Sequence, residues 1–268
     1  MKFYAFRGKL NEDTKVRIAD SQQACAKRGI EYLDTDVRQA DFSNPPVPDP
    51  GDILFQVSLT SGKLSRLMIR DDLATVYVSM KHGLAPSHQL IPHERHGIPM
   101  PRTIHKMTKD HDRLHRYVEA CGGYPVILKV RGGTHGVGVM KIDSFSSLIS
   151  ILDYLPTDTD VVMRQFIKTE SSERLVVLGD KVVASYRYNR QTADIRANAG
   201  KELKVEAMEY PAEMQETAVR AVHVLGAEHG GVDMLLDVEG NHYVLETNIP
   251  YCNFGRAVEA TGIDVGDL

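Results

Sequence analysis

The sequence of 268 residues predicts an α/β protein built from three lobes. The chain opens with a strand–helix–strand pattern, has a strand–glycine loop–strand unit near its middle, and closes with two strands that carry carboxylates. A chain of this length can bury roughly three quarters of its unfolded surface, which is enough for several small lobes that share interfaces. We therefore expect an N-terminal lobe over residues 1–83, a central lobe over 84–160 and a C-terminal lobe over 161–268.

The N-terminal lobe is predicted from the order of its elements. Residues 3–6 form a short apolar run typical of a strand, and residues 14–28 have helical periodicity that ends at Gly29. A second strand is expected over residues 30–33, and another begins at residue 52 after a proline-rich loop. This order predicts a small βαβ lobe, in which no motif indicates a particular chemistry.

The two later lobes are predicted from alternating strand and helix patterns. In the central lobe, residues 97–101 should be extended, because residues that precede proline avoid the helical region. The other elements expected there are a helix at 110–120 and strands at 125–130 and 139–142. The elements expected in the C-terminal lobe are strands at 161–167, 175–178, 181–188, 231–237 and 242–247, and a helix at 212–225.

The composition excludes several classes of protein. Hydrophobic residues make up 42% and charged residues 25% of the chain, and the formal net charge is −4, as in ordinary globular proteins. No run approaches the ~20 apolar residues that cross a membrane, and the first residues do not form a secretory signal. Lys and Arg do not outnumber Asp and Glu, which argues against a nucleic-acid binder. Three separated cysteines indicate no disulfide framework, so we expect a soluble cytoplasmic protein without nucleic-acid or membrane partners.

A glycine-rich loop joins two predicted strands of the central lobe. Its residues are Gly132, Gly133, Thr134, His135, Gly136, Val137 and Gly138. Such a loop offers backbone N–H groups that can surround phosphate oxygens. A Walker A loop is excluded because Val139 and Met140 follow instead of Lys and Ser or Thr, and a dinucleotide fingerprint is excluded because a strand follows instead of a helix. We predict a β-hairpin lid over phosphate, with Lys129 supplying a positive charge; the alternative is a surface hairpin with an ordinary lysine.

Two carboxylates and an amide form a second candidate site in the last strand pair. Glu246 and Asn248 are two residues apart on one strand, so both side chains leave the same face. Together with Asp233 on the neighbouring strand, they would provide the hard oxygen ligands that Mg²⁺ prefers. The alternative is a solvated strand end with ordinary charges. A separate loop contains Arg196 and Asn198, which by themselves indicate no chemistry.

The order of these segments resembles that of ATP-grasp enzymes. The matching segments are residues 97–103, 125–138, 164–167, 196–198, 231–233, 246–248 and 260–265. The chain looks like the RimK-like branch, which includes ribosomal-protein glutamate ligases and carrier-protein ligases of lysine biosynthesis, and the similarity covers about residues 95–268. This resemblance implies an ATP-grasp fold of the α/β class, with a small N-terminal βαβ lobe, a central lid lobe and a C-terminal lobe that binds ATP and Mg²⁺.

The resemblance also implies roles for the residues of the nucleotide site. Lys129 and the glycine loop would contact the ATP phosphates. The backbone of Gln165 and Ile167, on either side of Phe166, would bind the adenine edge, and Glu173 would contact the ribose.

The remaining implied roles concern phosphoryl transfer and the metal. Arg196 would stabilise the transferring phosphoryl group and an acyl phosphate, with Asn198 beside it in the nucleotide site. Asp233, Glu246 and Asn248 would hold one or two Mg²⁺ ions, for which Mn²⁺ is an alternative.

The activity that the resemblance implies is carboxylate–amine ligation. A carboxylate is a poor electrophile, whereas its acyl phosphate is readily attacked by an amine, and the reaction releases ADP and phosphate. The expected substrate is an amino acid or a peptide, including a protein or peptide tail, and a homo-oligomer is expected. Two alternatives remain: an ATP-grasp kinase that phosphorylates a small molecule, and a regulatory module that binds ATP without turnover.

The sequence departs from the RimK-like pattern at three places. A nucleotide-contacting lysine usually precedes the Gly-Ile-Pro segment, but residues 85–89 contain none, and His88 is either its replacement or a surface histidine. Pro-Gly usually follows the ligand asparagine, whereas Tyr251 and Cys252 follow Pro250 here, which leaves the identity of the acceptor open. The sequence ends at Leu268, where related enzymes usually continue into a further helix.

Overall fold

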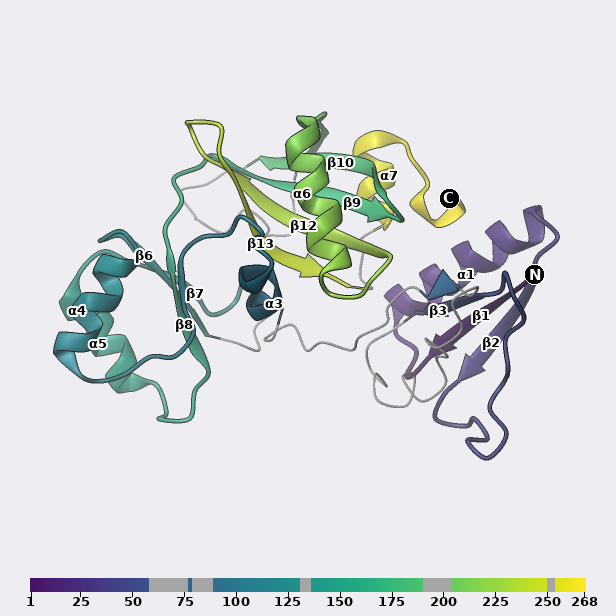
Figure 1. Cartoon of the computed structure of the whole chain (residues 1–268), viewed down its shortest axis with the longest axis horizontal. Coiled ribbons are helices and arrows are strands. Elements are labelled where there is room, and N and C mark those ends of the chain that lie inside the picture. Colours follow the sequence, from purple (N-terminus) through teal and green to yellow (C-terminus); the bar gives the residue numbers. More distant parts are fainter. Residues whose placement is uncertain (58–76, 79–88, 131–135, 190–203, 250–253) are drawn as a thin grey trace.

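The computed structural model describes residues 1–57, 77–78, 89–130, 136–189, 204–249 and 254–268. It has three lobes of mixed helix and sheet, and the C-terminal lobe lies between the central and the N-terminal lobe (Figure 1). The predicted α/β class is therefore confirmed.

The described part of the N-terminal lobe contains a parallel sheet and the long helix α1. Its elements are β1 (Lys2–Arg7), α1 (Glu12–Lys27), β2 (Glu31–Asp36), β3 (Ile53–Gln56) and β4 (Tyr77–Val78), and the strand order is β2-β1-β3-β4. Helix α1 begins after Asn11, whose side chain accepts a hydrogen bond of 2.8 Å from the Thr14 N–H and so satisfies one free donor of the first turn. Tyr4, Phe6 and Leu54 form the core of this lobe, and the βαβ opening agrees with the prediction.

The central lobe packs two helices on one face of an antiparallel sheet. Its elements are β5 (Thr103–Ile104), α4 (His111–Ala120), β6 (Val126–Val130), β7 (Val139–Ile142), α5 (Phe145–Tyr154) and β8 (Val161–Gln165). The strand order is β5-β8-β6-β7, so β8 pairs with β6 in this lobe, one strand beyond the boundary expected at residue 161. An apolar run predicts a strand but not its partner, which explains the difference. Leu114, Leu128 and Leu148 are fully buried between the helices and one face of the sheet.

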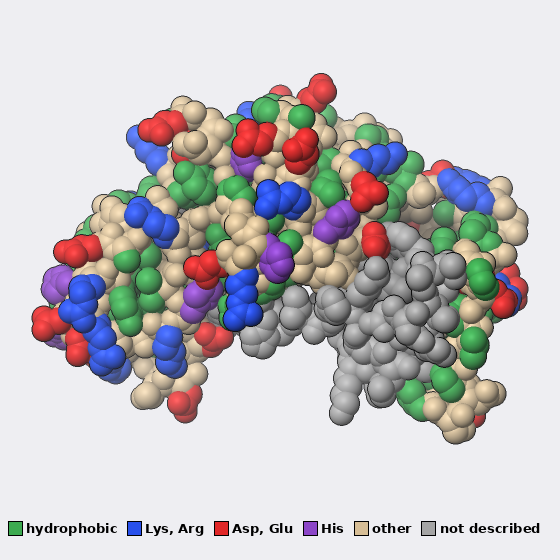
Figure 2. All heavy atoms as spheres, viewed as in Figure 1, with side chains coloured by type: hydrophobic (Ala, Val, Ile, Leu, Met, Phe, Trp, Pro, Cys, Tyr) green, Lys and Arg blue, Asp and Glu red, His purple; other side chains and the backbone are tan. Residues whose placement is uncertain are grey.

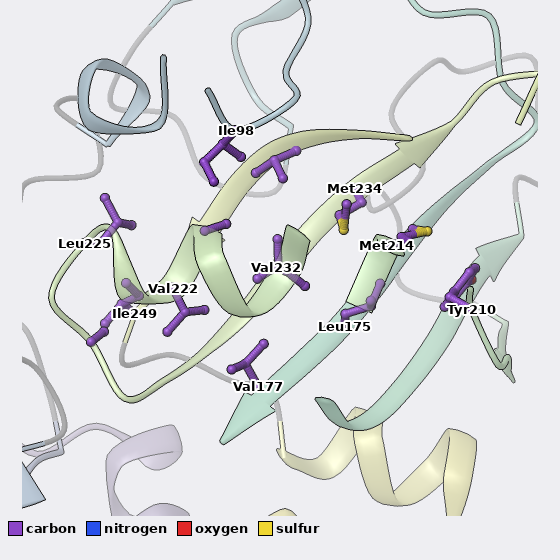
Figure 3. Packing of buried hydrophobic residues seen from close by; sticks show 14 residues of the cluster. Ile98, Leu175, Val177, Tyr210, Met214, Val222, Leu225, Val232, Met234 and Ile249 are labelled. Atoms are coloured by element: carbon purple, nitrogen blue, oxygen red, sulfur yellow. The ribbon is translucent and has the colours of Figure 1, made fainter. Parts of the chain in front are cut away.

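The C-terminal lobe is a five-stranded antiparallel sheet covered on both faces. Its elements are β9 (Ser171–Leu178), β10 (Lys181–Asn189), β11 (Val205–Ala207), α6 (Ala212–His223), β12 (His229–Leu236), β13 (His242–Asn248), α7 (Phe254–Thr261) and the 3₁₀ helix η2 (Val265–Asp267). The strand order is β11-β10-β9-β12-β13. Helix α6 packs Met214 and Val222 onto Leu175, Val232 and other residues of one face, as Figure 3 shows.

The opposite face of this sheet is covered by α7 and η2. Ala257 of α7 and Val265 of η2 pack against Val176 and Tyr186, which come from β9 and β10. This helix cover extends over the β10 side of the sheet, and the candidate site described below lies on the same face toward β13.

A short segment expected in the central lobe packs instead on the C-terminal lobe. Helix α3 (Leu90–Arg95) places the His93 ring against α6, with Nε2 at 2.9 Å from the Ala221 carbonyl oxygen. Ile98 joins the core below α6, and the Val244 N–H donates to the Pro99 oxygen at 2.8 Å. The chain therefore passes along the outer edge of β13 before it enters the central lobe.

In the part of the chain that the structure describes, the N-terminal lobe contacts the C-terminal lobe through the end of α1 and through Phe55. Asp267 of η2 bonds to Lys27 at 2.9 Å and to Arg28 at 3.2 Å, both at the end of α1. The rings of Phe55 and His229 stack with centroids 5.1 Å apart. Acidic and basic side chains are interspersed over the visible face of the molecule (Figure 2). Among the described residues, no helix combines the length and the apolar character that a membrane span requires.

Candidate active site between the central and C-terminal lobes

Asp233, Glu246 and Asn248 lie together on one face of the C-terminal sheet. Asp233 of β12 is the direct cross-strand partner of Glu246 on β13, and Asn248 is the partner of Gly231. The register shifts between Asp233 and Met234, because Val244 pairs with Met234 and Leu245 is the extra residue of a β-bulge. The bulge reverses the alternation, so Val244 enters the core below α6 while Glu246 turns to the face of Asp233. The structure thus brings the three predicted metal ligands side by side.

The Asp233 carboxylate has two partners in the sheet. Arg174 of β9 donates from Nε to Oδ1 at 2.7 Å and from Nη2 to Oδ2 at 3.0 Å, and the Asn248 amide donates to Oδ2 at 2.9 Å. Burial raises the pKa of the Asp233 carboxyl, Arg174 opposes this shift, and the neighbouring Glu246 adds to it. Attraction to Asp233 raises the pKa of Arg174 even though burial acts against its charge. The guanidinium and the carboxylate therefore form a buried, bidentate ion pair.

Glu246 meets a lysine from the central lobe. Lys129 of β6 points away from the helix-covered face of its sheet, and its Nζ lies 3.1 Å from Glu246 Oε2. The two side chains are 33% and 37% exposed. Beside them, Arg164 of β8 donates from Nη1 to the Leu245 carbonyl oxygen at 3.1 Å, which holds the two lobes together at the bulge. The predicted phosphate-binding lysine and a predicted metal ligand thus meet across the interface.

Strand β13 is held in place by residues that precede the central lobe. The Thr247 N–H donates to Gln89 Oε1 at 3.3 Å, and the Thr247 hydroxyl lies 3.4 Å from Nε2 of the fully buried His93. Burial lowers the pKa of His93, opposed by its bond to the Ala221 oxygen, so the ring is neutral near pH 7. These contacts fix the strand on which Glu246 and Asn248 lie.

The two strands of the predicted hairpin pair in the part that the structure describes, and its role as a lid stays a prediction. Strands β6 and β7 pair antiparallel, and the Val130 N–H donates to the Gly138 oxygen at 2.9 Å. Gly138 has φ 83°, and a Cβ there would lie 3.0 Å from the Val130 oxygen, so both conformation and space require glycine. Val137 at the tip is 63% exposed. Gly132, Gly133, Thr134 and His135 lie outside the described residues.

The connection from β8 to β9 contains the predicted adenine-binding segment. The Gln165 N–H donates to the Arg102 oxygen at 2.8 Å, so this segment is tied to the residue that precedes β5. Ile167 is buried, and Lys141 Nζ lies 5.6 Å from the centroid of the Phe166 ring. The contacts of Gln165, Phe166 and Ile167 with a nucleotide remain predictions.

Glu173, the expected ribose partner, lies on the other face of the C-terminal sheet from Asp233. Its carboxylate is fully buried and accepts bonds from Ser171 at 2.6 Å, from Arg187 at 3.3 Å and from the Tyr210 hydroxyl at the start of α6. A contact with ribose would require these bonds to be exchanged, so the role of Glu173 stays a prediction. Glu170, on the same connection, is exposed.

The part of the chain that forms this site matches a known protein family. A profile of the RimK-like ATP-grasp domain matches residues 84–266, which is well over half of the chain. The chain belongs to the RimK-like ATP-grasp family. The matched range begins before α3 and includes the lid, the bulged strand pair and α7.

Two relatives of this RimK-like ATP-grasp chain are named probable alpha-L-glutamate ligases. The protein from Rhodopirellula baltica is 34% identical over 157 residues, which are 58% of this chain and 38% of that protein. The protein from Picosynechococcus sp. is 29% identical over 210 residues, which are 77% of this chain and 63% of that protein. The chain thus spans between about two fifths and two thirds of the length of the curated relatives it matches.

A solved structure gives the same fold over nearly the whole chain. The ATP-grasp ligase PsnB, complexed with a minimal precursor, Mg and ADP, superposes with a TM-score of 0.71 and 18% identity, and the match covers 99% of this chain and 94% of that one. At this identity the similarity establishes the ATP-grasp fold, including its N-terminal lobe.

Several predicted features of this RimK-like ATP-grasp chain fall outside the described residues. Arg196 and Asn198 of the predicted phosphoryl-transfer loop belong to residues 190–203, and His88 belongs to residues 79–88. Tyr251 and Cys252 of the altered acceptor segment are also outside. Their roles stay predictions.

The most prominent site residue that the sequence did not indicate is Arg174. It directly precedes an apolar run, residues 175–178, that predicts only a buried strand. The role of Arg174 becomes visible only in the register of the sheet, where it is the cross-strand partner of Asp233. Arg164 and Gln89 were missed for the same reason, because their partners are distant in sequence.

Proposed function

We propose that the chain catalyses ATP-dependent ligation of a carboxylate to an amine. The carboxylate would accept the γ-phosphoryl group of ATP to form an acyl phosphate, and an amine would displace phosphate to form the amide. ADP and phosphate would be the other products. The family assignment and the names of the relatives support this reaction class.

The observation that carries the proposal is the meeting of Lys129 with Glu246. The contact joins a cation of the lid sheet to a carboxylate of the C-terminal sheet, and the glycine hairpin follows directly after β6. A partly exposed pair of this kind contributes only about 0–1 kcal/mol, so phosphate and metal can replace it without a large loss. In the liganded state Lys129 would turn to the phosphates, where a positive charge offsets the charge of the transferring group.

The residues beside Lys129 fit a magnesium ion that arrives with a nucleotide. Asp233, Glu246 and the Asn248 amide provide the oxygen donors that this ion prefers. Within the described residues, no group of three or more His, Cys, Asp and Glu side chains is arranged to hold a metal. Phosphate oxygens and water would complete the set, as in sites where Mg²⁺ is bound through one or two carboxylates and substrate phosphates. Such an ion would neutralise the phosphate charge during transfer.

The proposed substrate is an amino acid or a peptide. Relatives are named for glutamate ligation, and PsnB is a ligase that was complexed with a precursor. For this chain, the departures at Tyr251 and Cys252 leave the choice between a free amino acid and a peptide terminus to experiment.

The test is a screen for ADP release followed by analysis of the product. Amino acids and short peptides are presented in pairs with Mg·ATP, and the products are identified by mass spectrometry. An amide whose mass equals the two substrates less water supports ligation, and it should disappear in Glu246→Gln. A phosphorylated product without an amide would identify a kinase instead. Binding of ATP without product from any pair would favour a regulatory module.

A further inference from the structure

Arg174 lies at one end of a charged row that crosses three strands of the C-terminal sheet. Arg174 on β9, Asp233 on β12 and Glu246 on β13 are successive cross-strand partners. Lys129 from the lid completes the row at Glu246. The row therefore has a cation at each end and two neighbouring carboxylates between them, and its formal charges sum to zero.

The ion pair of Arg174 and Asp233 is built to hold one orientation. Two parallel N–H···O bonds fix the plane of the carboxylate, and the side chains are only 9% and 14% exposed. The guanidinium therefore sets the plane of the carboxylate.

Gly231 supplies the space in which Arg174 lies. A Cβ at Gly231 would be 2.6 Å from Arg174 Nη1 and 3.2 Å from its Cδ. Gly231 does not have a positive φ, so an alanine would be compatible with the backbone, and the restriction comes from the arginine alone. The Gly-Gly-Val-Asp segment thus contains both the acceptor of the ion pair and the gap that admits its donor.

We propose that Arg174 is a positioning residue that orients Asp233 and makes metal binding depend on the nucleotide. The inference rests on the proposed function of this site. With Arg174 and Lys129 in place, a divalent cation meets a row without net negative charge and gains little by binding alone. ATP adds the negative phosphates that complete the site, so metal and nucleotide bind together. Arg174 acts through Asp233 and does not itself bind the metal.

The first arm of the test measures Mg²⁺ binding without nucleotide. Isothermal titration calorimetry with MgCl₂ should show tighter binding to Arg174→Gln than to the wild type, by at least about tenfold. In this variant the negative charge of Asp233 has lost its counter-charge and attracts the cation from a few ångströms away. Arg174→Lys keeps the charge and should bind Mg²⁺ alone as weakly as the wild type. Arg187→Gln is the matched control, since Arg187 pairs with Glu173 at 3.3 Å on the other face of the same sheet. Equal Mg²⁺ affinity in Arg174→Gln and Arg187→Gln would overturn the proposal.

The second arm measures orientation. Arg174→Lys lacks the fork and should lower kcat more than it raises the KM for ATP, with only partial rescue relative to Arg174→Gln. Gly231→Ala keeps both members of the ion pair but displaces the guanidinium, so it should lower kcat in the same direction and remains informative where Arg174→Gln does not fold. Wild-type kcat in both Gly231→Ala and Arg174→Lys would contradict the positioning role. A wild-type chain that binds no Mg·ATP would reject the proposed function, whereas the titration with Mg²⁺ alone judges Arg174 separately.

Discussion

Two ion pairs meet at the candidate site, and they differ in depth and in reach. Arg174 and Asp233 lie on neighbouring strands of one sheet and are buried with bidentate geometry. Lys129 and Glu246 come from different lobes, are about one third exposed and share a single contact of 3.1 Å. The first pair is a fixed part of the sheet and the second is easily separated. The comparison suggests a division of labour in which one pair shapes the site and the other changes partners when ligand enters.

The largest effect is expected when the fixed pair is broken. Asp233→Asn leaves the Arg174 guanidinium buried without a counter-charge, and we expect a loss of about 3–5 kcal/mol in the free energy of unfolding. Glu246→Gln, the matched change in the separable pair, should alter it by under about 1 kcal/mol. Urea unfolding of the ligand-free proteins measures both. Equal losses in the two variants would remove the distinction between the pairs.

The separable pair should affect ligand binding instead of folding. Lys129→Met removes a charge-assisted hydrogen bond to phosphate, for which we expect a rise of about ten- to a hundredfold in the KM for ATP. The melting temperature without ligand should stay near that of the wild type. Lys109→Met is the control, because its ammonium pairs with Asp153 at 3.2 Å in the same lobe and not with Glu246. Equal effects of Lys129→Met and Lys109→Met on KM would argue against the special position of Lys129.

The smallest effect is expected from His93, the buried histidine that contacts Thr247 of β13. Because the pKa of His93 is lowered in the folded chain, the unfolded chain binds more protons as the pH falls below the ordinary histidine value of about 6.5. The contribution of neutral His93 to the free energy of unfolding should be fully present above that pH and should be lost below it. The slope from this group is at most about 1.4 kcal/mol per pH unit. His93→Gln keeps a donor toward the Ala221 oxygen and should remove this part of the slope. His223→Gln, at a partly exposed histidine, should leave it in place. Urea unfolding at several pH values is the measurement, and an unchanged slope in His93→Gln would contradict the assignment.

Much of the fold could be predicted from local patterns. The apolar runs of β6, β9 and β12 and the periodicity of α1 and α6 gave elements within a few residues of those observed. Helices α3 and α5 were missed, since the proline in α3 and the serines in α5 obscure helical periodicity. The assignment of β8 to the central sheet depends on its pairing with β6, which no local pattern contains.

The candidate site was predictable in composition and only partly in geometry. The spacing of Glu246 and Asn248 correctly indicated a shared face, but strict alternation would also have placed Val244 on that face. The bulge at Leu245 separates them, and bulges of this kind have no clear sequence signature. Arg174 escaped prediction because its significance comes from its cross-strand partner Asp233, which is 59 residues away along the chain.

The account is tested most directly by the thermal shift of Glu246→Gln with Mg·ATP. The ligand-free variant should be folded and melt near or above the wild-type temperature, because one of two neighbouring carboxylates has lost its charge. With saturating Mg·ATP the wild type should gain several degrees and the variant much less, and turnover should fall on the order of a hundredfold or more. An undiminished shift in Glu246→Gln, together with normal release of ADP, would show that Glu246 holds neither metal nor phosphate and would contradict the account.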